Sequence, residues 1–200
     1  MSSIIKHVLA MLPYVLIAAV PIFVFRAVRI CVLSKRKTPT TFWHEMGIIL
    51  FLLFMVGLFS QTIIPRLEFS GTGIGIVQAG DSGINLIPFK IFADSIREFQ
   101  TGNRSYFIIN LLGNIGMFLP IGFFIPLLWR ERNFRSTVLI TFLVSLFIEL
   151  CQLPQSRWTD IDDLWMNTLG GVAGYGVYWG IKRLFPELTA KFKVKGKRED

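Results

Sequence analysis

Five long apolar stretches, separated by shorter polar segments, form the dominant pattern along the chain. They run over residues 8–25, 46–64, 106–129, 134–153 and 164–181. Each has, or nearly has, the roughly 20 residues that an α-helix needs to cross a hydrocarbon core of about 30 Å. Inside that core every backbone polar group must find a partner within the protein, which a helix provides. The pattern therefore predicts an all-α integral membrane protein with about five transmembrane helices.

The segment 65–105, between the second and third stretches, divides into two halves. The first half is rich in glycine and predicts a small hairpin or an irregular flap. The second half starts at Pro88, which suits the first turn of a helix. Apolar side chains then recur at helical spacing, at Phe89, Phe92, Ile96 and Phe99. Such an amphipathic helix lies in the outer membrane interface. It is either a lid over a binding site or a passive surface helix.

Composition supports a membrane protein, because hydrophobic residues make up 52% of the chain and charged residues only 17%. That balance excludes an ordinary soluble domain of this length. The predicted organisation has four parts: a two-span N-terminal anchor (1–64), an extracytoplasmic loop (65–105), a three-span core (106–185) and a basic cytoplasmic tail (186–200).

The distribution of Lys and Arg orients the chain. Fifteen of the 21 lie between spans one and two, between spans three and four, or after span five. Because basic segments stay on the cytoplasmic side, we expect the N-terminus outside and the C-terminus in the cytoplasm. The net charge of +8 does not indicate nucleic-acid binding, since these residues sit where anionic lipid head groups lie. The expected location is the bacterial plasma membrane, crossed several times.

Polar side chains interrupt the last three stretches at one common depth, in the predicted outer half of the membrane. They are Asn110 and Asn114 on the third, Ser145, Glu149 and Gln152 on the fourth, and Asn167 on the fifth. Ionisable groups at membrane depth normally face the bundle interior or a wet cavity. This cluster is therefore the candidate ligand-binding site. The alternative is that its amides only join helices through hydrogen bonds.

The short loop before the fifth stretch adds charged candidates. Arg157 suits a phosphate or carboxylate group of a ligand. Three carboxylates follow, and oxygen ligands of this kind could hold a hard divalent cation such as Mg²⁺. They are Asp160, Asp162 and Asp163, whose spacing is not a specific metal motif. A structural alternative is that they cap the start of the fifth helix.

Short motifs in the second half of the chain carry a resemblance. They read, in order, NLIPF from Asn85, NLLGN from Asn110, SLFIELCQ from Ser145, RWTDIDD from Arg157 and NTLGG from Asn167. Over residues 85–185 this order resembles the VanZ-like family, and it adds Asn85 to the candidate ligand-binding residues. The family is named after an accessory protein of glycopeptide-resistance clusters in Gram-positive bacteria, associated with reduced susceptibility to teicoplanin. The resemblance implies a bacterial membrane protein but no settled reaction.

The favoured function is binding of a lipid-linked or amphiphilic cell-envelope ligand on the outer side, without turnover. Partners would be membrane lipids, a lipid-linked cell-wall precursor or a lipoglycopeptide antibiotic. The alternative is an intramembrane hydrolase or transferase in which Glu149 is the catalytic acid or base. An ion path is disfavoured, because no polar stripe continues into the cytoplasmic half of the last three stretches.

Overall fold

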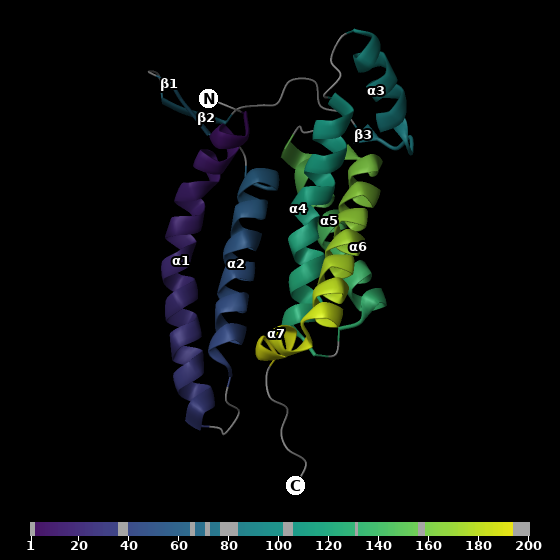
Figure 1. Cartoon of the computed structure of the whole chain (residues 1–200). Helices are drawn as coiled ribbons and strands as arrows, with labels where there is room; N and C mark the ends of the chain where they lie inside the picture. Colours follow the sequence, from purple (N-terminus) through teal and green to yellow (C-terminus); the bar gives the residue numbers. More distant parts are fainter. Residues whose placement is uncertain are drawn as a thin grey trace.

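The structure, a computed structural model, describes residues 3–35, 40–64, 67–70, 73–76, 84–101, 106–130, 132–155 and 159–193. In chain order the elements are α1 (Ser3–Lys35), α2 (Phe42–Thr62), β1 (Leu67–Ser70), β2 (Gly73–Ile76), β3 (Ile84–Asn85), α3 (Lys90–Gln100), α4 (Tyr106–Leu128), α5 (Phe134–Gln152), the 3₁₀ turn η1 (Leu153–Gln155), β4 (Thr159–Asp160), α6 (Ile161–Leu184) and α7 (Pro186–Lys191). Figure 1 shows the long helices side by side, with α3 at one end of the bundle and α7 at the other. We call these the α3 end and the α7 end.

Four helices are long and apolar enough to cross a membrane. The qualifying segments are Ala10–Val32, Phe42–Thr62, Asn110–Leu128 and Phe134–Gln152. The prediction of an all-α membrane protein is therefore confirmed. The fifth predicted span coincides with α6, which has 24 residues but is not among the qualifying segments. Its several glycines and aromatic side chains, together with Asn167, make it less apolar than the other four.

Glycine lets α6 pack closely against α4. A Cβ on Gly174 would lie 2.0 Å from the carbonyl oxygen of Leu119, and one on Gly122 would lie 2.0 Å from that of Gly171. Small residues at such positions allow helix backbones in membranes to approach each other. A buried apolar cluster beside this contact joins α2, α4 and α5, and it consists of Leu58, Phe118, Ile121, Ile125 and Ile148.

Two small β pairs lie outside the helices. Strands β1 and β2 pair antiparallel, in agreement with the predicted hairpin. Strands β3 and β4 pair parallel, with Asn85 opposite Asp160. This second pair could not be predicted from the sequence, because its strands are only two residues long and lie far apart in the chain. It holds the segment before α3 against the start of α6.

Helix α3 occupies the predicted amphipathic segment. Phe89 precedes it in the left-handed region, with φ of 64°. The apolar side chains of Phe92, Ile96 and Phe99 are exposed along one side of the helix. In a membrane protein such a surface meets lipid, which agrees with an interfacial position.

A buried ion pair joins α1 to α2. The guanidinium of Arg26 donates to Glu45 Oε2 through Nε, at 2.7 Å, and through Nη2. Both residues are buried. The end of α7 contacts the same region, because the ring Nδ1 of His44 lies 2.6 Å from the carbonyl oxygen of Phe192. The first two helices are therefore attached to the bundle by polar contacts as well as apolar packing.

Candidate ligand-binding site

A line of polar side chains connects α4, α6 and α5 near the α3 end. The amide of Asn114 on α4 donates to Asp163 Oδ1 on α6. The amide of Asn167, one turn further along α6, donates to Ser145 Oγ on α5 at 3.0 Å. Glu149 follows Ser145 by one turn, so it lies on the same face of α5. We call these five residues the polar stripe. The predicted convergence of three helices at one depth is thus observed.

Exposure falls along the polar stripe from one end to the other. Asn114 and Asp163 are half-buried, whereas Ser145, Asn167 and Glu149 are buried. At the buried end, Glu149 Oε2 and Asn167 Oδ1 have no hydrogen-bond partner among the described residues. Buried acceptors without a donor are unfavourable and uncommon in folded proteins. The buried end therefore presents two acceptors for donor groups from a ligand or from water.

Three carboxyl groups cluster around the buried end of the polar stripe. The carboxylates of Asp163 and Asp160 lie within electrostatic range of Glu149. No basic side chain forms an ion pair with any of these three carboxylates in the part of the chain that the structure describes. Hydroxyl, amide or ammonium groups suit this environment better than a phosphate does.

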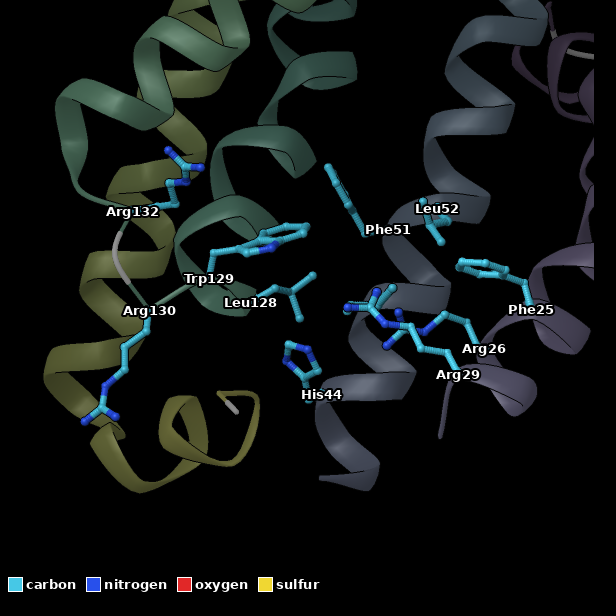
Figure 2. Close-up of a pocket in the computed structure, with 11 residues that line it drawn as sticks. Phe25, Arg26, Arg29, His44, Phe51, Leu52, Leu128, Trp129, Arg130 and Arg132 are labelled. Carbon is cyan, nitrogen blue, oxygen red and sulfur yellow. The ribbon is translucent and has the colours of Figure 1, made fainter. Parts of the chain in front are cut away.

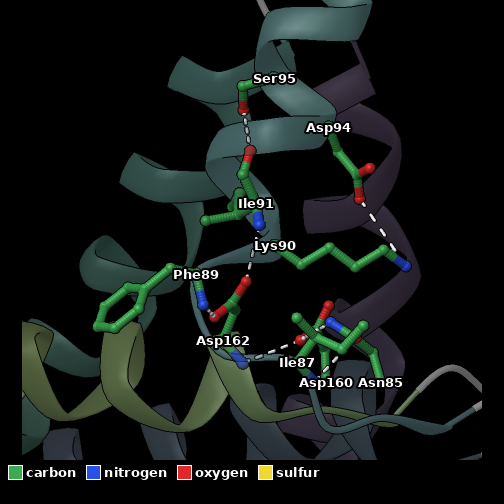
Figure 3. Close-up of polar contacts among 9 residues, drawn as sticks. All are labelled: Asn85, Ile87, Phe89, Lys90, Ile91, Asp94, Ser95, Asp160 and Asp162. Atoms are coloured by element: carbon green, nitrogen blue, oxygen red, sulfur yellow. Dashed lines mark hydrogen bonds and ion pairs between the residues drawn. The ribbon is translucent and has the colours of Figure 1, made fainter.

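Asp162 serves a structural purpose (Figure 3). Its side chain is fully buried. Oδ2 accepts from the backbone N–H of Ile91 at 2.7 Å, and Oδ1 accepts from the backbone N–H of Phe89 and from Trp165 Nε1 at 2.8 Å. Both oxygens thus fix the first turn of α3 to the first turn of α6. The candidate ligand-binding residue Asp162 is an anchor for α3 in this structure.

Asp160 and Asn85 take part in the same anchor. Asp160 Oδ1 accepts from Asn85 Nδ2 at 2.8 Å and from the backbone N–H of Asp162 at 2.9 Å, which makes Asp160 the N-cap of α6. Asn85 Oδ1 accepts from the backbone N–H of Ile87. Among the described residues no group of three or more His, Cys, Asp or Glu side chains could hold a metal ion. The structure thus does not bring Asp160, Asp162 and Asp163 together as a set of cation ligands. Both oxygens of Asp162, and Oδ1 of Asp160 and of Asp163, accept hydrogen bonds from N–H groups instead.

Three further candidates are not among the five residues of the polar stripe. Gln152 Nε2 donates to the carbonyl oxygen of Thr62 at 3.0 Å, so this amide attaches α5 to the end of α2. Asn110 is half-buried one helical turn before Asn114, toward the α3 end. Arg157 lies outside the described residues.

A comparison with protein families decides the assignment. The family model VanZ/LLP1 matches residues 45–185. The chain belongs to the VanZ/LLP1 family. The match starts well before the motifs at residue 85, so α2 is part of the family region. No curated protein and no solved structure matches the chain. The family and the four apolar helices together make the chain a multi-pass protein of the bacterial membrane.

Sequence reasoning missed one component of this VanZ/LLP1 site, Trp165. Its ring lies 5.6 Å from that of Phe89 and stacks on that of Phe92 at 6.3 Å with an interplanar angle of 11°. Trp165 comes from α6, far from α3 in the chain, and only the anchor at Asp162 brings the three rings together. They form an aromatic cluster at the α3 end, where α6 also carries Asp163 of the polar stripe on another of its faces.

Proposed function

We propose that the polar stripe binds an amphiphilic cell-envelope ligand through hydroxyl or amide donors. The observation that carries this proposal is the pair of buried acceptors without a donor, Glu149 Oε2 and Asn167 Oδ1. A ligand group that donates to both would remove the free-energy penalty of leaving them unpaired. The half-buried Asn114 and Asp163 provide polar contacts at the more exposed end of the stripe.

The surroundings of the polar stripe favour a ligand that also has an apolar part. Phe89 is 61% exposed and Ile96 62% exposed, although both are large apolar side chains. With Phe92, Phe99 and Trp165 they provide a surface for an acyl chain at the level of the head groups. A ligand whose polar donor groups bind the stripe and whose acyl chain lies on α3 is an amphiphile.

Family membership points to the biological setting of such a ligand. A lipoglycopeptide of the teicoplanin type has amide and hydroxyl donors and an acyl chain. A lipid-linked cell-wall precursor has such donors and a long isoprenoid chain. We infer that the chain faces the outside with its α3 end and reduces susceptibility to such antibiotics by binding one of these amphiphiles. The ligand is released unchanged.

The experiment compares Glu149→Gln with a matched control in a Gram-positive bacterium that lacks proteins of this family. Gln replaces one acceptor oxygen with an amide donor, which would oppose the ligand's own donor. Glu187→Gln makes the same chemical change on α7, at the opposite end of the bundle, where the side chain is exposed. A buried polar group left without its hydrogen-bond partner costs about 1–3 kcal/mol, roughly fivefold or more in affinity.

We expect wild type and Glu187→Gln to raise the inhibitory concentration of teicoplanin several-fold, and Glu149→Gln to lose this effect at equal membrane levels. A glycopeptide without an acyl chain should be affected much less. Equal protection by Glu149→Gln would show that the buried acceptors do not bind the ligand. Recovery of a chemically altered lipid that depends on Glu149 would replace the binding function with the enzymatic one.

A further inference from the structure

A second site lies at the α7 end, away from the polar stripe. A cavity of about 600 Å³ separates the first two helices from the end of α4. Figure 2 shows Arg26 and Arg29 extending toward it from α1 and Trp129 from the segment after α4. Arg130 and Arg132 also line it from that segment, with their guanidinium groups directed away from those of Arg26 and Arg29. Cavities of this size hold small molecules or head groups.

The charge of this cavity is positive and largely uncompensated. Arg26 is paired with Glu45. Arg29, Arg130 and Arg132 form no ion pair among the described residues. The guanidinium groups of Arg26 and Arg29 match the oxygens of a phosphate, and Arg130 and Arg132 add positive charge at the edge of the cavity.

An apolar cleft continues from the cavity into the bundle. The cleft has a volume of about 320 Å³ and shares Phe51, Trp129 and Arg132 with the cavity. Its other lining residues are apolar side chains of α2, α4 and α5, such as Ile125 and Val144. Positive charge at the opening and an apolar extension behind it suit a head group with an attached acyl chain.

We propose that this cavity binds the phosphate of an anionic lipid, with one acyl chain in the cleft beside Phe51 and Trp129. Phosphate is the chemistry that the arginines recognise, and the cleft distinguishes a lipid from a soluble phosphate. Basic pockets between transmembrane helices bind anionic head groups in other membrane proteins. This site is independent of the ligand proposed for the polar stripe.

The test uses the full chain in mild detergent with equal amounts of phosphatidylglycerol and phosphatidylcholine of matched acyl chains. Native mass spectrometry measures the retained lipid. The cavity variant is Arg29→Gln with Arg132→Gln, two exposed side chains whose replacement breaks no ion pair among the described residues. The control variant is Lys182→Gln with Arg183→Gln, which removes the same charge from exposed positions of α6 near the same end. Circular dichroism checks that both variants fold.

We expect wild type to retain more phosphatidylglycerol than phosphatidylcholine. In the cavity variant the retained phosphatidylglycerol should fall about tenfold, and in the control variant it should change little. Equal losses in the two variants, or no preference in wild type, would overturn the proposal. A second measurement tests whether inorganic phosphate changes the thermal stability of the protein. If it raises the thermal stability of wild type but not of the cavity variant, and no lipid is retained, the lipid assignment is wrong and the anion is a soluble phosphate.

Discussion

At the scale of residues, the carboxylate of Asp162 decides where α3 begins. It accepts three N–H groups, two of them from the backbone on either side of Lys90. Because Phe89 has a left-handed backbone, the turn into α3 needs this support. The aromatic cluster at the α3 end depends on the same anchor, so a small chemical change at Asp162 should alter the ligand surface.

We predict that Asp162→Asn loosens α3 while leaving the long helices intact. The NH₂ group of Asn would replace one carboxylate oxygen and would face an N–H donor. A buried donor left without an acceptor costs about 1–3 kcal/mol. Hydrogen exchange of peptides covering 84–101 should become faster by a factor of roughly ten or more. The control is Asp94→Asn, whose 4.0 Å contact with Lys90 is partly exposed and contributes little. Unchanged exchange in Asp162→Asn would show that packing alone holds α3.

Individual residues also show what could be predicted from the sequence and what could not. Ser145, Glu149 and Asn167 could be placed together because helical periodicity and a common membrane depth act on each helix separately. Asp162 could not be recognised as an anchor, since its partners Phe89 and Ile91 lie more than seventy positions away and carry no complementary side-chain signal. A backbone N–H exists at nearly every residue, so sequence does not show which one a carboxylate will bind.

At the scale of elements, the bundle depends on the glycine contact between α4 and α6. We predict that Gly174→Ala destabilises the protein by about 1–3 kcal/mol, because its Cβ would overlap the backbone of α4 at Leu119. Gly176→Ala on the same helix is the control, since nothing lies within 4 Å of its Cβ position. Thermal unfolding in detergent should separate the two variants. Equal stability would mean that α4 and α6 can move apart without loss.

The elements themselves were predictable where one physical effect dominates. Apolar length identified the long helices, and helical spacing identified α3. The ends were less predictable: α1 continues to Lys35, ten residues beyond the apolar stretch, because backbone hydrogen bonding does not stop where hydropathy falls. The cavity at the α7 end was not predicted, since its arginines come from α1 and from the segment after α4, and only tertiary packing brings them together.

At the scale of the whole molecule, the two ends of the bundle differ in charge, and this difference should set its orientation. The last turns of α1 and α4 lie at the α7 end, together with the first turn of α2 and α7 itself (Figure 1). The segments there carry most of the Lys and Arg residues. A basic residue near the anionic cytoplasmic leaflet contributes about 1 kcal/mol, so many of them together favour one orientation strongly. We predict that the α7 end is cytoplasmic and that α3 lies outside.

Single cysteines test this orientation after Cys31 and Cys151 are replaced with serine. Thr101→Cys follows α3 and Glu187→Cys lies on α7, and both positions are exposed. An impermeant maleimide should label Thr101→Cys in intact cells and Glu187→Cys only after permeabilisation. The reverse result would place the polar stripe near the cytoplasm, out of reach of an antibiotic that acts outside the cell. The lipid site at the α7 end would then face the outer leaflet, so this one measurement decides which membrane surface supplies each ligand.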